Sequence, residues 1–134
     1  MLPIAPLMIE HRLIERMIAV MEMQAEGIQA GQELDPRFIP EVVDFMRTYA
    51  DRTHHGKEED ILFKVLKGKK LSGAHRRVLE KLEDDHVKAR EMVRKLSSLG
   101  EEHARGSPSA AYHASMLMKD LATFYHAHIE LEDQ

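Results

Sequence analysis

The sequence contains no cysteine, which excludes disulfide bonds, thiolate chemistry and every metal or iron–sulfur site built on cysteine. Any bound metal must therefore be held by His, Asp or Glu, a donor set that suits iron, manganese, zinc or nickel. No apolar stretch approaches the roughly 18 residues of a membrane-spanning helix. The opening stretch MLPIAPLMIEH lacks the basic and apolar regions of a signal peptide. We therefore expect a cytoplasmic protein that does not enter membranes.

Nucleotide-binding loops, nucleophile motifs and basic stripes are also missing, and the formal net charge is only −4. This balance gives no reason to expect nucleic acid or an acidic membrane surface as a partner. No segment alternates apolar and polar residues with the period of a strand. With 43% apolar residues in 134 positions, the chain is long and apolar enough for one folded domain spanning residues 1–134.

Turn signals divide the chain into four expected helices. Asp35-Pro36 and Ser107-Pro108 each pair a capping residue with a proline that suits a first helical position. The helices are expected to span about residues 6–29, 36–67, 73–104 and 108–134. Because the loops between them are short, successive helices should be antiparallel neighbours. The sequence therefore predicts an all-α, up-down-up-down four-helix bundle.

An α-helix turns about 100° per residue, so the direction of each side chain can be compared with the apolar stripe of its helix. One histidine in each expected helix lies on that stripe. These histidines are His11, His55, His86 and His128, and Glu59 and Glu132 follow two of them by four residues. The neighbouring His54 and His126 are predicted to face outward. If the third helix continues to about Ala104, the four inward histidines lie in one layer to within about one turn. That length places Gly100 inside a helix, at a cost of roughly 0.5–1 kcal/mol.

This predicted layer of histidines and carboxylates indicates a metal site. Two carboxylates buried without partners would be very costly, and charged groups in a core are normally paired or bound to metal. Nitrogen and oxygen ligands without sulfur suit a di-iron or di-manganese pair, and a purely structural His–Glu network is the alternative. The weaker candidates are Glu15 and Glu83 as further ligands, Tyr49 and Tyr125 as pocket-lining residues, and His75, His103 and His113 as core-edge or surface residues.

The segments IEHRLIERM, HHGKEEDILF, EDDHVKAR and HIELED occur in this order along the chain. With these segments, from Glu10 to Asp133, the sequence resembles a hemerythrin-like, HHE cation-binding domain. The resemblance implies a four-helix bundle that holds a non-haem di-iron centre. It assigns His11 and His55 to one iron, His86 and His128 to the other, and Glu59 and Glu132 as bridging carboxylates.

The sequence departs from oxygen-carrying hemerythrins at Leu82. Those proteins have two histidines four residues apart on the third helix, whereas the position four before His86 is Leu82, which cannot ligate. The second iron would then have an open position, a solvent ligand or a carboxylate such as Glu83. This departure favours sensing, redox chemistry or iron handling over reversible oxygen carriage.

The resemblance implies a protein that binds dioxygen or a related small diatomic at an open iron position, in sensing, storage or protection. The alternatives are a di-iron oxidoreductase acting on peroxide, nitric oxide or iron, and a metal-independent interaction bundle. The sequence therefore leaves open whether the protein is an enzyme. The chain stops two residues after Glu132, where family members usually continue. We expect a trimmed fourth helix whose exposed apolar surface would favour a homodimer.

Overall fold

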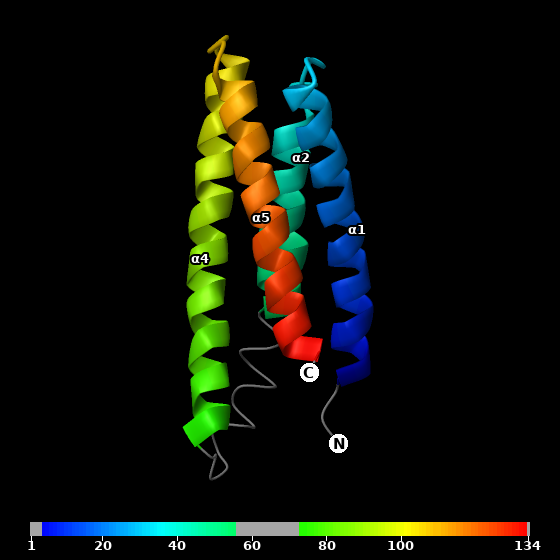
Figure 1. Ribbon diagram of the computed structural model, residues 1–134, viewed down its shortest axis with the longest axis vertical. Coiled ribbons are helices and arrows are strands. Elements are labelled where there is room, and N and C mark those ends of the chain that lie inside the picture. Colours follow the sequence, from blue (N-terminus) through cyan, green and yellow to red (C-terminus); the bar gives the residue numbers. More distant parts are fainter. Residues whose placement is uncertain (1–3, 56–72, 134) are drawn as a thin grey trace.

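The computed structural model describes residues 4–55 and 73–133, and every element in these ranges is a helix (Figure 1). Within them, side chains are described for residues 10–51, 77, 80, 81 and 83–130. The elements are α1 (Ile4–Gln29), α2 (Phe38–Phe45), the π-helix η1 (Met46–His55), α4 (Gly73–Ala104) and α5 (Ala110–Asp133). Because α2 continues directly into η1, the described chain forms four helical rods, which confirms the predicted all-α fold.

The four rods lie side by side along one direction (Figure 1). α5 packs between α1 and α4, and both α2 and η1 pack against α4, while η1 also contacts α1. The start of α1 and the end of α5 lie at the same end of the bundle, and the turns after α1 and α4 lie at the other. This arrangement is the predicted four-helix bundle.

The bundle core receives aliphatic and aromatic side chains from all four rods. The predicted stripe of α1 is buried at Ile14, Ile18, Met21 and Ala25. The other rods contribute Ile39, Val42, Val43 and Met46, then Ala89, Val93 and Leu96, then Met118, Leu121 and Tyr125. Burial of a large aliphatic or aromatic side chain contributes about 1.5–3 kcal/mol. Packing of these faces, more than helix propensity, therefore holds the rods together.

Two glycines close the turns at one end of the bundle. Gly31 and Gly106 have φ values of 98° and 89°, in the left-handed region where glycine has no steric penalty. After Gly31, the backbone amide of Gln32 donates to the Gly27 carbonyl over 2.9 Å. After Gly106, the backbone amide of Ser107 donates to the Glu102 carbonyl over 3.0 Å. Both ends are Schellman caps, which satisfy carbonyls at the helix C-terminus and stop the helix there.

The second rod begins two residues later than the sequence predicts. The Asp35 carboxylate accepts a hydrogen bond from the Arg37 amide over 2.9 Å, and the Phe38 amide donates to the Asp35 carbonyl over 3.0 Å. Pro36 and Arg37 therefore form a turn, and the helix starts at Phe38. The prediction of Asp35 as cap was wrong in register, because its side chain stabilises this turn instead. α5 likewise begins at Ala110, two residues after the predicted Pro108.

Gly100 lies inside α4, as predicted, and the packing explains why glycine occupies this position. A Cβ at Gly100 would lie 2.6 Å from Cγ2 and 3.2 Å from Cβ of Ile39. Ile39 is 2% exposed, and its branched side chain has little freedom at χ1. Glycine at this position therefore allows α4 to approach α2 closely.

The second rod changes its hydrogen-bond pattern midway. From Met46 to His55 it is a π-helix, whose bonds join residues five apart instead of four. Each turn therefore contains more residues than an α-helical turn, and the rotation of about 100° per residue does not apply across this segment. The side chains of His54 and His55 lie outside the described residues, so the predicted facing of these two histidines stays a prediction. π-Helical segments are rare and occur frequently at functional sites.

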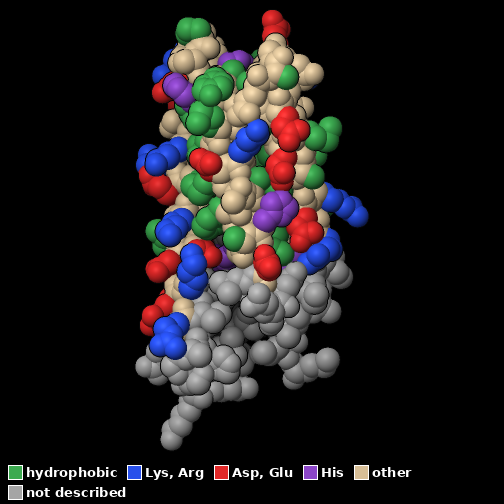
Figure 2. Space-filling model, in the orientation of Figure 1, with side chains coloured by type: hydrophobic (Ala, Val, Ile, Leu, Met, Phe, Trp, Pro, Cys, Tyr) green, Lys and Arg blue, Asp and Glu red, His purple; other side chains and the backbone are tan. Residues whose placement is uncertain are grey.

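The outer surface of the described chain mixes charges of both signs. Figure 2 shows acidic and basic side chains interspersed over the visible face, as the small net charge predicts. None of the described helices is long and apolar enough to cross a bilayer.

Candidate metal centre

Three of the predicted ligands have described side chains, and all three are buried. His11 of α1, His86 of α4 and His128 of α5 are 3%, 1% and 2% exposed. Their outward-predicted neighbour His126 is exposed and pairs with Glu22 over 2.9 Å. The different environments of His126 and His128 agree with the facing predicted from the α-helical period.

His86 and His128 lie next to each other across the contact between α4 and α5. Their ring centroids are 5.4 Å apart with an interplanar angle of 60°. Phe124, one turn before His128 on α5, stacks on the His128 ring with an interplanar angle of 7° and a centroid separation of 6.2 Å. Two imidazoles from different helices therefore share one buried region, and one of them lies parallel to an aromatic ring.

Asp85 fixes the His128 ring through a buried hydrogen bond. Nδ1 of His128 lies 3.1 Å from Oδ2 of Asp85, and the two side chains are 2% and 5% exposed. The other carboxylate oxygen, Oδ1, accepts a hydrogen bond from Lys81 Nζ over 2.7 Å. Lys81 is half-exposed, so its ammonium remains partly hydrated while it pairs with a buried carboxylate. The result is a chain of contacts from solvent through Lys81 and Asp85 to His128.

The charge of Asp85 determines which nitrogen of His128 carries the proton. Burial by itself raises the pKa of the Asp85 carboxyl, but hydrogen bonds from Lys81 and His128 outweigh that effect and hold the pKa below its usual value. An ionised carboxylate can only accept hydrogen bonds, so the neutral His128 ring must be protonated at Nδ1. Its Nε2 then carries an unprotonated lone pair, which is the form that binds a metal.

Two buried imidazole nitrogens have the chemistry of cation ligands. Among the described residues, Nε2 of His128 and Nε2 of His11 are buried and have no hydrogen-bond partner, although both residues make other contacts. A buried polar nitrogen normally has a partner, and a neutral imidazole nitrogen is a common metal ligand. His128 is hydrogen-bonded at Nδ1 to the Asp85 carboxylate. This is the carboxylate–histidine arrangement that supports metal ligation in proteins.

The comparisons with known proteins identify the family. A family model described as the hemerythrin HHE cation binding domain matches residues 2–134. The chain belongs to the hemerythrin HHE cation-binding family. No curated protein and no solved structure matches it. This HHE domain is therefore a cation-binding protein, and its buried histidines are the candidate cation ligands.

The remaining predicted ligands of the HHE domain lie outside the described part of the structure. Glu59 belongs to the segment that is not described, and the side chains of His55 and Glu132 are not described, although their backbones end η1 and lie near the end of α5. Among the described residues, no group of three or more His, Asp or Glu side chains forms a metal site. The complete six-residue ligand set therefore stays a prediction.

The weaker candidates occupy various positions in the HHE domain. The Glu15 carboxylate, which is partly exposed, pairs with Arg12 over 3.2 Å. Glu83 is half-buried on α4 and makes contacts there. His103 is half-buried, His113 is exposed, and the side chain of His75 is outside the described set.

Two acidic residues of the HHE domain are buried although the sequence pattern did not predict it. Asp85 and Glu10 are 4% and 6% exposed, and each directly precedes a buried histidine. Asp85 could have been found from its spacing, because it precedes the buried Ala89 by four residues and Leu96 by eleven, as expected for one helical face. The adjacent Asp84 and His86 concealed this spacing within the charged segment EDDH.

Proposed function

We propose that this HHE domain holds two iron ions in a non-haem centre and binds dioxygen or a related small diatomic there. The ligands would be His11, His55, His86 and His128, with Glu59 and Glu132 as carboxylate ligands shared between the metals. The observation that carries the proposal is the Asp85–His128 hydrogen bond beside His86, because it prepares one buried imidazole for a metal within a cation-binding family.

Iron is the metal that we favour for this donor set. The chain offers nitrogen and oxygen ligands and no sulfur, which suits iron or manganese more than copper(I) or an iron–sulfur cluster. Four-helix bundles that hold carboxylate-rich di-iron centres build them from side chains that project inward from all four helices. The buried histidines of α1, α4 and α5 agree with that pattern.

Each described residue would have a distinct role at the centre. When bound, the metal pair would supply electrons and an open coordination position for the small ligand. Asp85 holds the proton of His128 at Nδ1 and orients the ring, and Lys81 keeps Asp85 ionised. Phe124 lies parallel to the His128 ring and would limit the rotation of that ring. These contacts would keep the His128 lone pair in place before the metal arrives.

Leu82 favours a second candidate function, an oxidoreductase that acts on peroxide, nitric oxide or iron. It stands four residues before His86, where a histidine would fill the coordination shell of oxygen carriers. A coordination position that stays open serves turnover better than stable carriage. The two functions share the same ligands and differ in what happens to the bound molecule.

Optical spectra tell the functions apart. The iron-loaded chain is reduced without oxygen, and its absorption spectrum is recorded before and after admission of air. A new visible band that disappears again under vacuum would support carriage or sensing, whereas lasting oxidation with consumption of peroxide would support the oxidoreductase. A spectrum without any iron-dependent change would refute both functions.

A further inference from the structure

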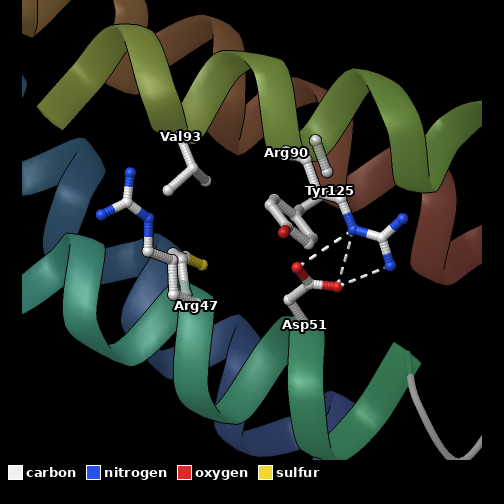
Figure 3. A pocket seen from close by; sticks show the side chains of 7 residues that line it. Arg47, Asp51, Arg90, Val93 and Tyr125 are labelled. Atoms are coloured by element: carbon white, nitrogen blue, oxygen red, sulfur yellow. Dashed lines mark hydrogen bonds and ion pairs between the residues drawn. The ribbon is translucent and has the colours of Figure 1, made fainter. Parts of the chain in front are cut away.

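A small pocket lies between η1 and α4, one turn away from the buried histidines. It has a volume of about 70 Å³ and is lined by Met46, Arg47, Asp51, Ala89, Arg90, Val93 and Tyr125. A cavity of about 10–15 Å³ by the same measure holds one water molecule, so the pocket has room for a molecule of a few heavy atoms. Figure 3 shows Arg47 reaching from η1 toward Val93, and Arg90 extending from α4 over Asp51.

The position of this pocket relates it to the predicted centre. Tyr125 is three residues before His128, and Ala89 is three residues after His86. At about 1.5 Å of rise per residue, these separations amount to roughly 4.5 Å along the helix axes. The pocket is therefore one turn from the level of the two histidines, and Tyr125, which is 2% exposed, forms part of its inner wall.

The charges around the pocket favour an anion. Two guanidinium groups and one carboxylate line it, which leaves one net positive charge. Arg90 is paired with Asp51, with Nε 3.0 Å from Oδ1 and Nη2 2.9 Å from the same oxygen. The Arg47 side chain forms no hydrogen bond or ion pair with the described residues. One guanidinium is therefore free to recognise an added negative charge.

The Arg90–Asp51 pair is partly open to water. Its side chains are 46% and 27% exposed, and ion pairs with such access to water contribute little net stability. Arg90 already lines the pocket, so an anion bound there could take the place of Asp51 beside this second guanidinium. Asp51 thus competes with an incoming anion for Arg90, and its removal should strengthen anion binding.

We propose that this pocket binds a small monoanion, of the size of azide or nitrite, next to the metal centre. Arg47 and Arg90 recognise the negative charge, and Asp51 opposes it. The role of this pocket as an access point to the metal centre rests on the proposed function. Occupancy of the pocket itself depends only on the described residues.

The test uses azide as the probe and the full chain as purified. Azide is titrated at neutral pH and constant ionic strength, adjusted with chloride, while the side-chain Nε–H signals of the arginines are followed by NMR. In parallel, the association rate of azide with the iron-loaded chain is measured by stopped-flow absorbance, with uncharged nitric oxide as the comparison ligand.

Charge-matched variants decide the outcome. Arg47→Gln should weaken azide binding and slow azide association by about three- to ten-fold, and Asp51→Asn should change both in the opposite direction. Arg94→Gln removes the same charge from an exposed residue of α4 that pairs with Glu91 outside the pocket, and it should leave azide binding unchanged. Nitric oxide association should be the same in all three variants.

Equal azide binding by Arg47→Gln and Arg94→Gln would overturn the pocket proposal, as would an Asp51→Asn variant that weakens binding. Both results can be obtained while the chain still contains iron, so the proposed function would survive them. Conversely, suppose that the chain takes up no iron when iron is supplied, but its arginine signals still respond to azide. That result would refute the metal centre and retain the anion site.

Discussion

Asp85→Asn is the change that most sharply tests how His128 is prepared for a metal. In the wild-type protein, Oδ1 of Asp85 faces Lys81 at 2.7 Å and Oδ2 faces Nδ1 of His128 at 3.1 Å. Asparagine has one oxygen and one NH₂ group for these two positions. The Lys81 ammonium can only donate, so it should attract the oxygen and turn the NH₂ group toward His128.

The expected loss follows from the tautomer of His128. An NH₂ group facing Nδ1 requires that nitrogen to accept, which moves the ring proton to Nε2 and blocks the nitrogen proposed to bind iron. Loss of such a supporting carboxylate typically costs 10–100-fold in metal affinity, or about 1.4–2.7 kcal/mol. We therefore expect Asp85→Asn to reduce ferrous iron affinity by that factor, measured anaerobically by competition with a coloured chelator.

Two further variants make the test specific. Asp84→Asn removes the same charge from the adjacent, exposed residue and should bind iron as the wild type does. Adding Lys81→Met to Asp85→Asn frees the amide to present its oxygen to His128, so part of the affinity should return. Equal affinities of Asp84→Asn and Asp85→Asn, with similar melting temperatures, would refute the orienting role of Asp85.

Gly100→Ala should destabilise the fold by about 1–3 kcal/mol, because the new methyl group would overlap Ile39. Gly27→Ala, whose methyl would meet only the end of an exposed glutamine side chain, should be neutral or stabilising by up to about 1 kcal/mol; equal shifts in thermal melts would contradict the close helix contact. His128→Ala should lower iron content markedly while His126→Ala leaves it intact, since the first residue is buried and the second is exposed. Iron loss in His126→Ala alone, measured by elemental analysis of folded protein, would show that the assigned facing is reversed.

Much of the fold follows from local sequence signals. The α1 stripe of Ile14, Ile18 and Met21 is buried as its spacing predicts, because regular α-helical geometry applies throughout that helix. The glycines at the ends of α1 and α4 mark where those helices stop, since their left-handed conformations are local requirements.

The parts that sequence could not predict depend on contacts between helices. Nothing in the run from Met46 to His55 indicates a π-helix, and the rotation of about 100° per residue expected of an α-helix does not apply within it. Asp85 was missed because its role depends on its hydrogen bonds with Lys81, one turn earlier on α4, and with His128 of α5. The facing of His54 and His55 consequently stays a prediction.

The central claim, that the histidines of this HHE domain hold a pair of iron ions, is tested most directly by counting metal. The full chain is produced with iron supplied, purified without chelators, and measured for iron, manganese and zinc per chain by elemental analysis. We expect about two iron ions per chain, as in other four-helix bundles with carboxylate-bound di-iron centres. A single zinc ion, or no metal after iron supplementation, would contradict the proposed centre.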